Sequence, residues 1–153
     1  EALLLAYKKL KIRKITEFSF LERGSDERQF NSYGVDLKIN NNHLHINFLK
    51  TLNSYFSKDS YSFKYQLKLI GSTFQKKVWY EISKIKYGQT ITYNDIARKL
   101  SSSPRAIGNA CSKNKCLLLI PCHRIIRSNG NAGGYVLGEN IKEYLIKLEK
   151  NAK

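Results

Sequence analysis

Two helix-forming stretches separated by a short break constrain the fold of this chain most. Thr92 is a favoured helix N-cap, and Ile96, Ala97 and Leu100 follow it at helical spacing. The stretch SSSP then interrupts the pattern, and Pro104 opens a second helix, RAIGNACSKN, because proline is tolerated in the first turn of a helix. The sequence therefore predicts a helix, a tight turn and a second helix.

The charge of the chain indicates the kind of partner that this helix pair would meet. Its 153 residues include 27 Lys and Arg against 12 Asp and Glu, which gives a net charge of +15, and the basic residues are spread along the whole sequence. Such a surface favours a polyanion, with nucleic acid first, although a solvated surface that binds nothing has the same composition. The pair is a candidate DNA-binding helix-turn-helix, while similar pairs also occur in helical domains that bind nothing.

A change of pattern along the chain indicates two domains. Upstream, short strand-like stretches such as VDLKI and HLHINF alternate with polar turns, and INFLKTLNSYF has the apolar spacing of a helix. We expect an α+β fold whose small N-terminal α/β domain, a mixed sheet plus a helix, occupies residues 1–68. A mainly helical, winged-helix-like C-terminal domain that carries the helix-turn-helix is expected over residues 69–153.

The second half carries further predicted elements besides the helix pair. An apolar stripe predicts a helix that begins at Ser72 or Thr73 and ends at Tyr87 and Gly88; its members are Phe74, Val78, Trp79, Ile82 and Ile85. CLLLIPC is too short for a typical helix and predicts an extended buried segment. RSNGNAGGY is then a glycine-rich loop, and ENIKEYLIKLEK a closing amphipathic helix.

The cysteines and the hydropathy pattern bear on compartment and cofactors. Cys111, Cys116 and Cys122 are odd in number and lack CxxC spacing, so neither a disulfide framework nor a common zinc site is expected, and no metal or other cofactor is predicted. No apolar run approaches ~18 residues, and the opening EALLLAYKKL does not resemble a signal peptide. We expect a cytoplasmic protein, nuclear if the source is eukaryotic, with no membrane partner.

The stretch IPCHRII makes Cys122 a candidate nucleophile. Pro121 stiffens the chain that leads to it, and only the thiolate form of cysteine is nucleophilic. His123, Arg124 and Arg127 are the nearby groups that can lower the pKa of the thiol. A buried structural thiol remains the alternative, because free cysteine is commonly buried as a small apolar residue.

The geometry of neighbouring residues sets conditions on a Cys122–His123 pair. Side chains of adjacent strand residues point to opposite faces, so contact between this thiol and this ring requires a turn or a bridging water. An orienting carboxylate is then expected on the far side of the ring. Glu139, Glu143 and Glu149 of the closing helix are the candidates, and Glu149 lies among apolar residues where partial burial is expected.

Several linked motifs resemble the O6-alkylguanine-DNA alkyltransferases. PCHR followed by two isoleucines, with RAIGNA before it and GGY after it, is similar to the pattern of that family. FQxxVW, YGxTxxY and IA precede these motifs in the family's order. The resemblance runs from about Gly71 to Lys150 and is only architectural in the first half of the chain.

The resemblance implies direct reversal of DNA alkylation damage. The Cys122 thiolate would take the alkyl group from O6 of a guanine flipped out of duplex DNA through the minor groove, in a single turnover that restores guanine, with O4-alkylthymine as a further substrate to test. His123 and Glu149 would complete a relay through a water molecule, and Tyr93 would help to rotate the nucleotide and protonate the leaving guanine. No cofactor is implied, and a monomer is expected.

The same resemblance assigns roles in DNA binding and in the substrate pocket. Arg105 would fill the position that the flipped base leaves, where a plain phosphate contact is the alternative. The other residues expected at the DNA are Ser103, Ala106, Gly108 and Asn109. The residues expected to line or support the pocket are Asn114 as a hinge, Arg124, Tyr135, Val136, Leu137 and Lys142.

The chain also departs from the family pattern. Lys115 stands where a proline usually follows the hinge asparagine, and the turn before the second helix is shorter than in some relatives. Val136 and Leu137 stand where smaller or hydroxyl-bearing residues are common, which puts acceptance of bulky adducts such as benzyl in doubt while methyl should fit. Three alternative functions stay open, namely a relative that flips alkylguanine without repairing it, a cysteine hydrolase, and a transcription factor with a structural thiol.

Overall fold

The computed structural model describes residues 50–51, 54–56 and 69–151. Contacts divide the chain into two units, Glu1–Leu69 and Ile70–Lys153. In the first unit the described residues 50–51 and 54–56 are helical, and they belong to the predicted helix INFLKTLNSYF. The rest of that helix and nearly all of the expected α/β domain lie outside the described residues, so the domain over 1–68 stays a prediction.

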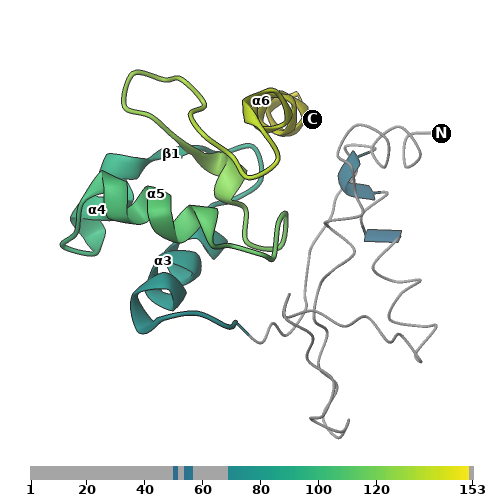
Figure 1. The fold of residues 1–153 in the computed structure, drawn as a ribbon. Helices are drawn as coiled ribbons and strands as arrows, with labels where there is room; N and C mark the ends of the chain where they lie inside the picture. The colour runs from purple at the N-terminus through teal and green to yellow at the C-terminus, as the bar shows by residue number, and fades with distance from the viewer. Residues whose placement is uncertain (1–49, 52–53, 57–68, 152–153) are drawn as a thin grey trace, which may run out of the picture. The chain divides into compact units, whose positions relative to one another are not determined.

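Short helices and a two-stranded sheet make up the second unit (Figure 1). This mixture of helices with a small sheet agrees with an α+β fold, whereas the winged-helix-like detail stays a prediction. No helix among the described residues has the length and apolar character needed to cross a membrane. The elements in chain order are α3 (Thr73–Ser83), β1 (Ile91–Thr92), α4 (Tyr93–Lys99), α5 (Pro104–Ser112), η2 (Cys122–Arg124), β2 (Ile125–Ile126) and α6 (Glu139–Lys150).

Helix α3 begins as the sequence predicts and ends one turn earlier. Ser72 is its N-cap, with a capping box to Gln75, and the apolar side chains of Val78, Trp79 and Ile82 are buried. The predicted end at Tyr87 and Gly88 is wrong, because the helix stops at Ser83. Turn hydrogen bonds replace the helical ones after that residue, such as the bond from the Ile85 amide to the Ile82 carbonyl, 3.0 Å.

The predicted helix, turn and helix are confirmed in α4 and α5. Thr92 caps α4 with a capping box to Asp95, and Pro104 occupies the first turn of α5 behind its N-cap, Ser103. Between the helices Ser101 adopts a positive φ of 48°, which turns the chain within four residues. The two helices pack together, and α5 also packs against α3, where Trp79 Nε1 donates to the carbonyl oxygen of Ala110, 2.9 Å away.

The apolar segment after α5 is buried but not extended, so that prediction is half wrong. Leu117, Leu118 and Ile120 are each at most 3% exposed, yet the segment forms turns, with Leu118 at a φ of +67°. Asn114 holds these turns: its Oδ1 accepts from the Cys116 amide at 2.9 Å, and its Nδ2 donates to the Ile120 carbonyl at 2.9 Å. Asparagine therefore satisfies backbone groups that an extended strand would pair with a neighbour.

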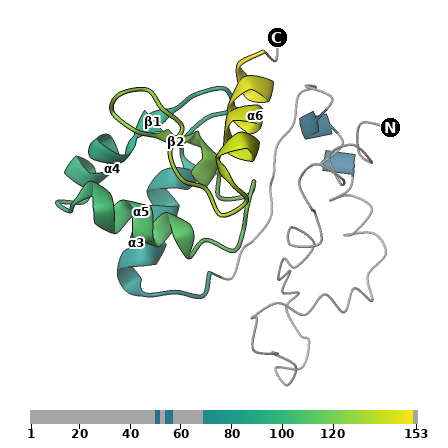
Figure 2. The same cartoon turned by 45° about the horizontal axis from the view of Figure 1, so that its top comes forward.

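Parallel pairing of β1 with β2 positions the residues around Cys122. Ile91 pairs with Ile125 and Thr92 with Ile126, so α4 begins at the same end of this small sheet at which Arg127 follows β2. Figure 2 shows β1 and β2 side by side between the helix pair and α6. Helix α6 packs against η2 and buries Leu145, which places its last turn behind that segment.

Candidate active site

Cys122 occupies a buried position at the start of η2. The residue is only 3% exposed, and the Nδ2 group of Asn114 donates to its Sγ atom at 3.0 Å. Burial, with the neighbouring Cys111 thiol, raises the pKa of Cys122 well above its ordinary value, against the lowering effects of the Asn114 hydrogen bond and the Lys142 charge. The resting thiol is therefore protonated, and its activation requires a base.

Glu149 forms a buried pair with His123, the residue that follows the thiol in η2. His123 is fully buried, and its Nε2 atom lies 2.7 Å from Oε1 of Glu149. Burial lowers the pKa of His123, so the ring is neutral at physiological pH. Because Glu149 is ionised, Nε2 carries the proton and donates it to the carboxylate, which leaves Nδ1 as the basic nitrogen of the ring.

Arg124 and Gly88 complete the hydrogen bonds to the Glu149 carboxylate. Arg124 Nε donates to Oε2 at 2.8 Å and Nη2 donates to Oε1 at 3.0 Å, while the Gly88 amide donates to Oε2 at 3.1 Å. Although burial raises the pKa of this carboxyl, the hydrogen bonds from His123 and Arg124 lower it to about 2. Arg124 was one candidate for lowering the pKa of the thiol; its guanidinium binds Glu149 and the Ile85 carbonyl, and Asn114 and Lys142 are the groups that lower that pKa.

The predicted geometry of the Cys122–His123 pair has a specific outcome. The expected strand is replaced by the 3-10 helix η2, and a turn was one of the two arrangements, with a bridging water as the other, that contact between the two side chains required. Glu149 is also the carboxylate, among the three candidates, that reaches the His123 ring. The water-mediated step from the thiol to Nδ1 stays a prediction.

A cavity of about 600 Å³ opens onto Cys122. Its walls come from α4, α5, η2 and the loop between β2 and α6. Six of the residues predicted for the site line this cavity, whereas the others do not. Those six are Tyr93, Arg105, Gly108, Cys122, Tyr135 and Val136.

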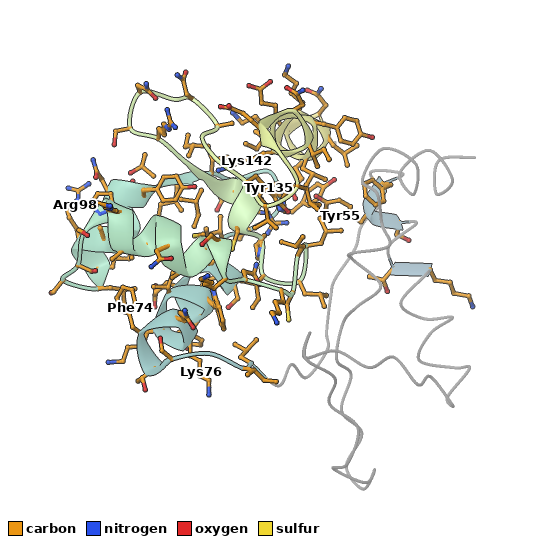
Figure 3. The ribbon with its side chains drawn as sticks, viewed as in Figure 1. Tyr55, Phe74, Lys76, Arg98, Tyr135 and Lys142 are labelled. Atoms are coloured by element: carbon orange, nitrogen blue, oxygen red, sulfur yellow. The ribbon has the colours of Figure 1, made fainter. Side chains whose placement is uncertain are left out.

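Lys142 of α6 connects two parts of the cavity wall. Its buried Nζ atom donates to Tyr93 Oη and to the Gly134 carbonyl oxygen, each at 3.2 Å. Burial lowers the pKa of Lys142 to about 8 and raises the pKa of Tyr93 to about 12. Tyr93 is therefore protonated at neutral pH, with an ammonium donor on its hydroxyl oxygen. In Figure 3, Lys142 and Tyr135 lie near each other, far from the exposed Arg98 of α4.

The remaining predicted residues lie around this cavity without lining it. Ser103 caps α5, and its Oγ atom accepts from the Ala106 amide at 3.2 Å. Asn109 is exposed on the same helix. Leu137 lies in the turn before α6, so it is not among the residues that line the cavity. Among the described residues, no group of three or more His, Cys, Asp or Glu side chains is placed to hold a metal ion.

Comparison with known proteins identifies the family of this chain. The family model described as "6-O-methylguanine DNA methyltransferase, DNA binding domain" matches residues 73–151. A methylated-DNA--protein-cysteine methyltransferase of Metallosphaera sedula is 41% identical over 109 residues, which are 71% of this chain and 69% of that protein. The chain belongs to the methylated-DNA--protein-cysteine methyltransferase family.

Other members of this family extend the comparison. The methyltransferase of Methanocaldococcus vulcanius is 49% identical over 82 residues, which are 54% of this chain and 50% of that protein. The crystal structure of Mycobacterium tuberculosis OGT in complex with DNA has a TM-score of 0.66 and 36% identity, and covers 69% of this chain and 66% of that one. These matches span from half to about two thirds of the relatives' own lengths.

The sequence did not predict what Asn114 and Gly88 do in this methyltransferase-family site. Asn114 was expected as a hinge, and its contact with the sulfur of Cys122 has no sequence signal of its own. Gly88 was overlooked, although the YGxTxxY motif contains it. Its φ is +75°, and a Cβ atom there would lie 3.2 Å from the Glu149 carbonyl oxygen, so both the conformation and the close approach require glycine.

Proposed function

We propose that this protein repairs alkylated DNA by transferring the alkyl group from O6 of guanine to Cys122. The observation that carries the proposal is a buried thiol facing a cavity, with a neutral histidine and an ionised carboxylate behind it. The family to which the chain belongs supports the same reaction, since its curated relatives are named methylated-DNA--protein-cysteine methyltransferases. Each molecule reacts once, because the thioether formed on Cys122 is not cleaved again.

The reaction begins with removal of the Cys122 proton. His123 Nδ1 takes this proton through a water molecule, while Glu149 holds the ring by its Nε2–H group and stabilises the imidazolium that forms. The Asn114 amide and the Lys142 charge stabilise the thiolate, since both favour the ionised form. The base, its partner and the donors to sulfur are thus all contributed by this chain.

Attack on the alkyl carbon completes the transfer. The Sγ–C bond forms while the bond between the alkyl carbon and O6 breaks, and the electron pair of that bond moves onto the guanine. Tyr93 donates its hydroxyl proton to the leaving guanine, and Lys142 Nζ, which donates to Tyr93 Oη, stabilises the phenolate that results. Guanine is restored, and Cys122 carries the alkyl group.

DNA binding is assigned to the α4–α5 pair as a helix-turn-helix at the minor groove. The residues at the DNA are Ser103, Arg105, Ala106, Gly108 and Asn109 of α5 and its cap. Flipping the damaged guanine into the cavity costs a few kcal/mol of stacking, which Arg105 offsets by occupying its place. We propose that the protein acts as a monomer in the cytoplasm, or in the nucleus of a eukaryote. Size-exclusion chromatography tests the monomeric state.

Replacing Arg105 by alanine is expected to slow repair of duplex DNA. A stacking side chain contributes roughly 1–3 kcal/mol, so the single-turnover rate should fall about tenfold to a hundredfold. Transfer from the free base O6-methylguanine, which requires no flipping, should keep its rate. Lys147→Ala is the control, because Lys147 is exposed on α6, outside the helix pair assigned to DNA. An equal loss on the free base would contradict the assigned role.

Intact-protein mass spectrometry tests the proposed function directly. The protein is mixed in excess with a short duplex that carries one O6-methylguanine, and the Cys122 peptide is then sequenced. Gain of one methyl group on that peptide is the expected result. Binding of the duplex without modification would instead favour the relative that flips alkylguanine without repairing it. A parallel duplex with O6-benzylguanine measures the restriction expected from Val136, which is 47% exposed and lines the cavity.

A further inference from the structure

Arg127 lies at the end of β2, in a loop that fixes its position. Its amide donates to the Asn131 carbonyl at 2.9 Å, and its own carbonyl accepts from the Gly130 amide at 3.0 Å. Its side chain lies against Gly133, where a Cβ atom would be 3.1 Å from Nε and 3.2 Å from Cγ of Arg127. Gly133 also has a φ of +73°, so the loop backbone forms a close-fitting support for this arginine.

The residues that line the cavity leave it with positive charge only. Arg105 and Arg127 both line the cavity, and none of the described residues that line it is Asp or Glu. Within the described part of the chain, no carboxylate forms an ion pair with Arg127. An exposed guanidinium on a cavity without acidic residues is suited to an anionic ligand.

Arg127 was a candidate for lowering the pKa of Cys122 because the two residues are close in the sequence. The cation that lowers the pKa of this thiol is Lys142. Arg127 instead lowers the pKa values of Tyr93 and Lys142, so its charge lies near Tyr93, which lines the cavity, and near the lysine that donates to it. The role of Arg127 is therefore not explained by activation of the nucleophile.

We propose that Arg127 binds a backbone phosphate next to the flipped nucleotide, an inference that rests on the proposed repair function. When a guanine enters the cavity to reach Cys122, its sugar and phosphates stay outside, because they remain part of the DNA strand. Arg127 is exposed on the cavity wall, and its guanidinium offers the planar pair of donors that matches phosphate oxygens. The two cavity arginines then have different ligands, the base stack for Arg105 and a phosphate for Arg127.

Arg127→Gln tests the contact, because glutamine removes the charge from an exposed position. With a duplex that carries O6-methylguanine, the single-turnover rate is expected to fall about tenfold. Duplex binding is also measured at several salt concentrations on a Cys122→Ser background. The magnitude of the slope of log affinity against log salt concentration is expected to decrease by about 0.9, the value for one phosphate contact. With free O6-methylguanine, which carries no phosphate, the rate is expected to fall by much less than with the duplex, because Arg127 then acts only through its charge on Tyr93 and Lys142. Lys147→Gln is the control, because Lys147 is exposed on α6, outside both the helix pair assigned to DNA and the cavity lining.

Neutral methylphosphonate linkages identify the phosphate itself. One linkage at a time is introduced on either side of the lesion, and duplex affinity is measured for Cys122→Ser alone and for Cys122→Ser combined with Arg127→Gln. At the contacted phosphate the neutral linkage should weaken binding about tenfold when Arg127 is present and have no effect after Arg127→Gln. Equal effects with and without Arg127 at every linkage, or equal loss of transfer from the free base, would overturn the proposal. Absence of methyl transfer by the unmodified protein would instead overturn the repair function, because these affinities are measured without transfer.

Discussion

Cys122→Ser is expected to abolish alkyl transfer while leaving DNA binding intact. A serine hydroxyl has nearly the same shape as the thiol but is a far weaker nucleophile at neutral pH, and the Asn114 amide can donate to either atom. The affinity for a duplex with O6-methylguanine should stay within about twofold, since the substitution removes no charge or surface contact. Mass spectrometry should detect no methyl group on the variant after prolonged incubation.

The neighbouring cysteines provide the controls for this experiment. Cys111 lines the same cavity, and Cys116 lies in the turns after α5. Cys111→Ser and Cys116→Ser should both retain stoichiometric transfer to Cys122. Restoration of guanine by Cys122→Ser, or a methyl group found on Cys111 of the unmodified protein, would show that the nucleophile has been wrongly assigned.

Glu149→Gln is expected to lower both the stability and the rate of transfer. The carboxylate accepts hydrogen bonds from Gly88, His123 and Arg124, and an uncharged amide leaves the buried guanidinium without its counter-ion. Removing one partner of a buried ion pair costs roughly 3–5 kcal/mol in the free energy of unfolding. The transfer rate should fall about a hundredfold or more, because the imidazolium of His123 loses its stabilising charge.

Glu143→Gln is the matched control for this variant. Glu143 lies on the same helix, α6, with an exposed side chain, so its free energy of unfolding should change by less than about 0.5 kcal/mol. Urea unfolding of both variants, followed by circular dichroism, separates the loss of stability from the loss of rate measured in native buffer. Equal stabilities for the two variants would contradict the hydrogen-bonding role given to Glu149.

Acid should remove the stabilising effect of the same carboxylate. The pKa of Glu149 is about 2 in the folded protein and 4.5 ordinarily, so its contribution is fully present above pH 4.5 and is lost as the pH falls toward 2. The free energy of unfolding should therefore decrease more steeply in this window for the unmodified protein than for Glu149→Gln. Urea titrations in steps from pH 6 to 3 measure the difference, and parallel curves would contradict it.

The parts of the fold that sequence predicts well are those with local causes. Ser72, Thr92 and Pro104 mark helix starts because capping involves residues only a few positions apart. The end of α3 was misplaced because the segment after it bonds to residues far away in the sequence. The Gly88 amide donates to Glu149, and the Ile85 carbonyl accepts from Arg124. An apolar pattern likewise indicates burial of the segment after α5 but cannot indicate the backbone turn there.

The candidate site divides in the same way. Cys122, His123 and Glu149 could be named in advance because the motifs of a known family contain them and the strand argument required a carboxylate behind the ring. Arg124 was assigned to the thiol because it is near in sequence, whereas its guanidinium reaches a carboxylate 25 residues away. The contact of Lys142 with Tyr93 joins residues 49 positions apart and is defined only once α6 is packed.

The hydrogen bonds that converge on one carboxylate have a consequence for how this protein can vary. Glu149 joins the loop at Gly88, the turn at His123 and Arg124, and the last turn of α6. A substitution at any of these positions is therefore expected to lower both the free energy of unfolding and the rate of alkyl transfer. Genetic selection for abundance and genetic selection for resistance to alkylating agents would reject the same changes here, so catalytic tuning of this protein has to proceed at other positions.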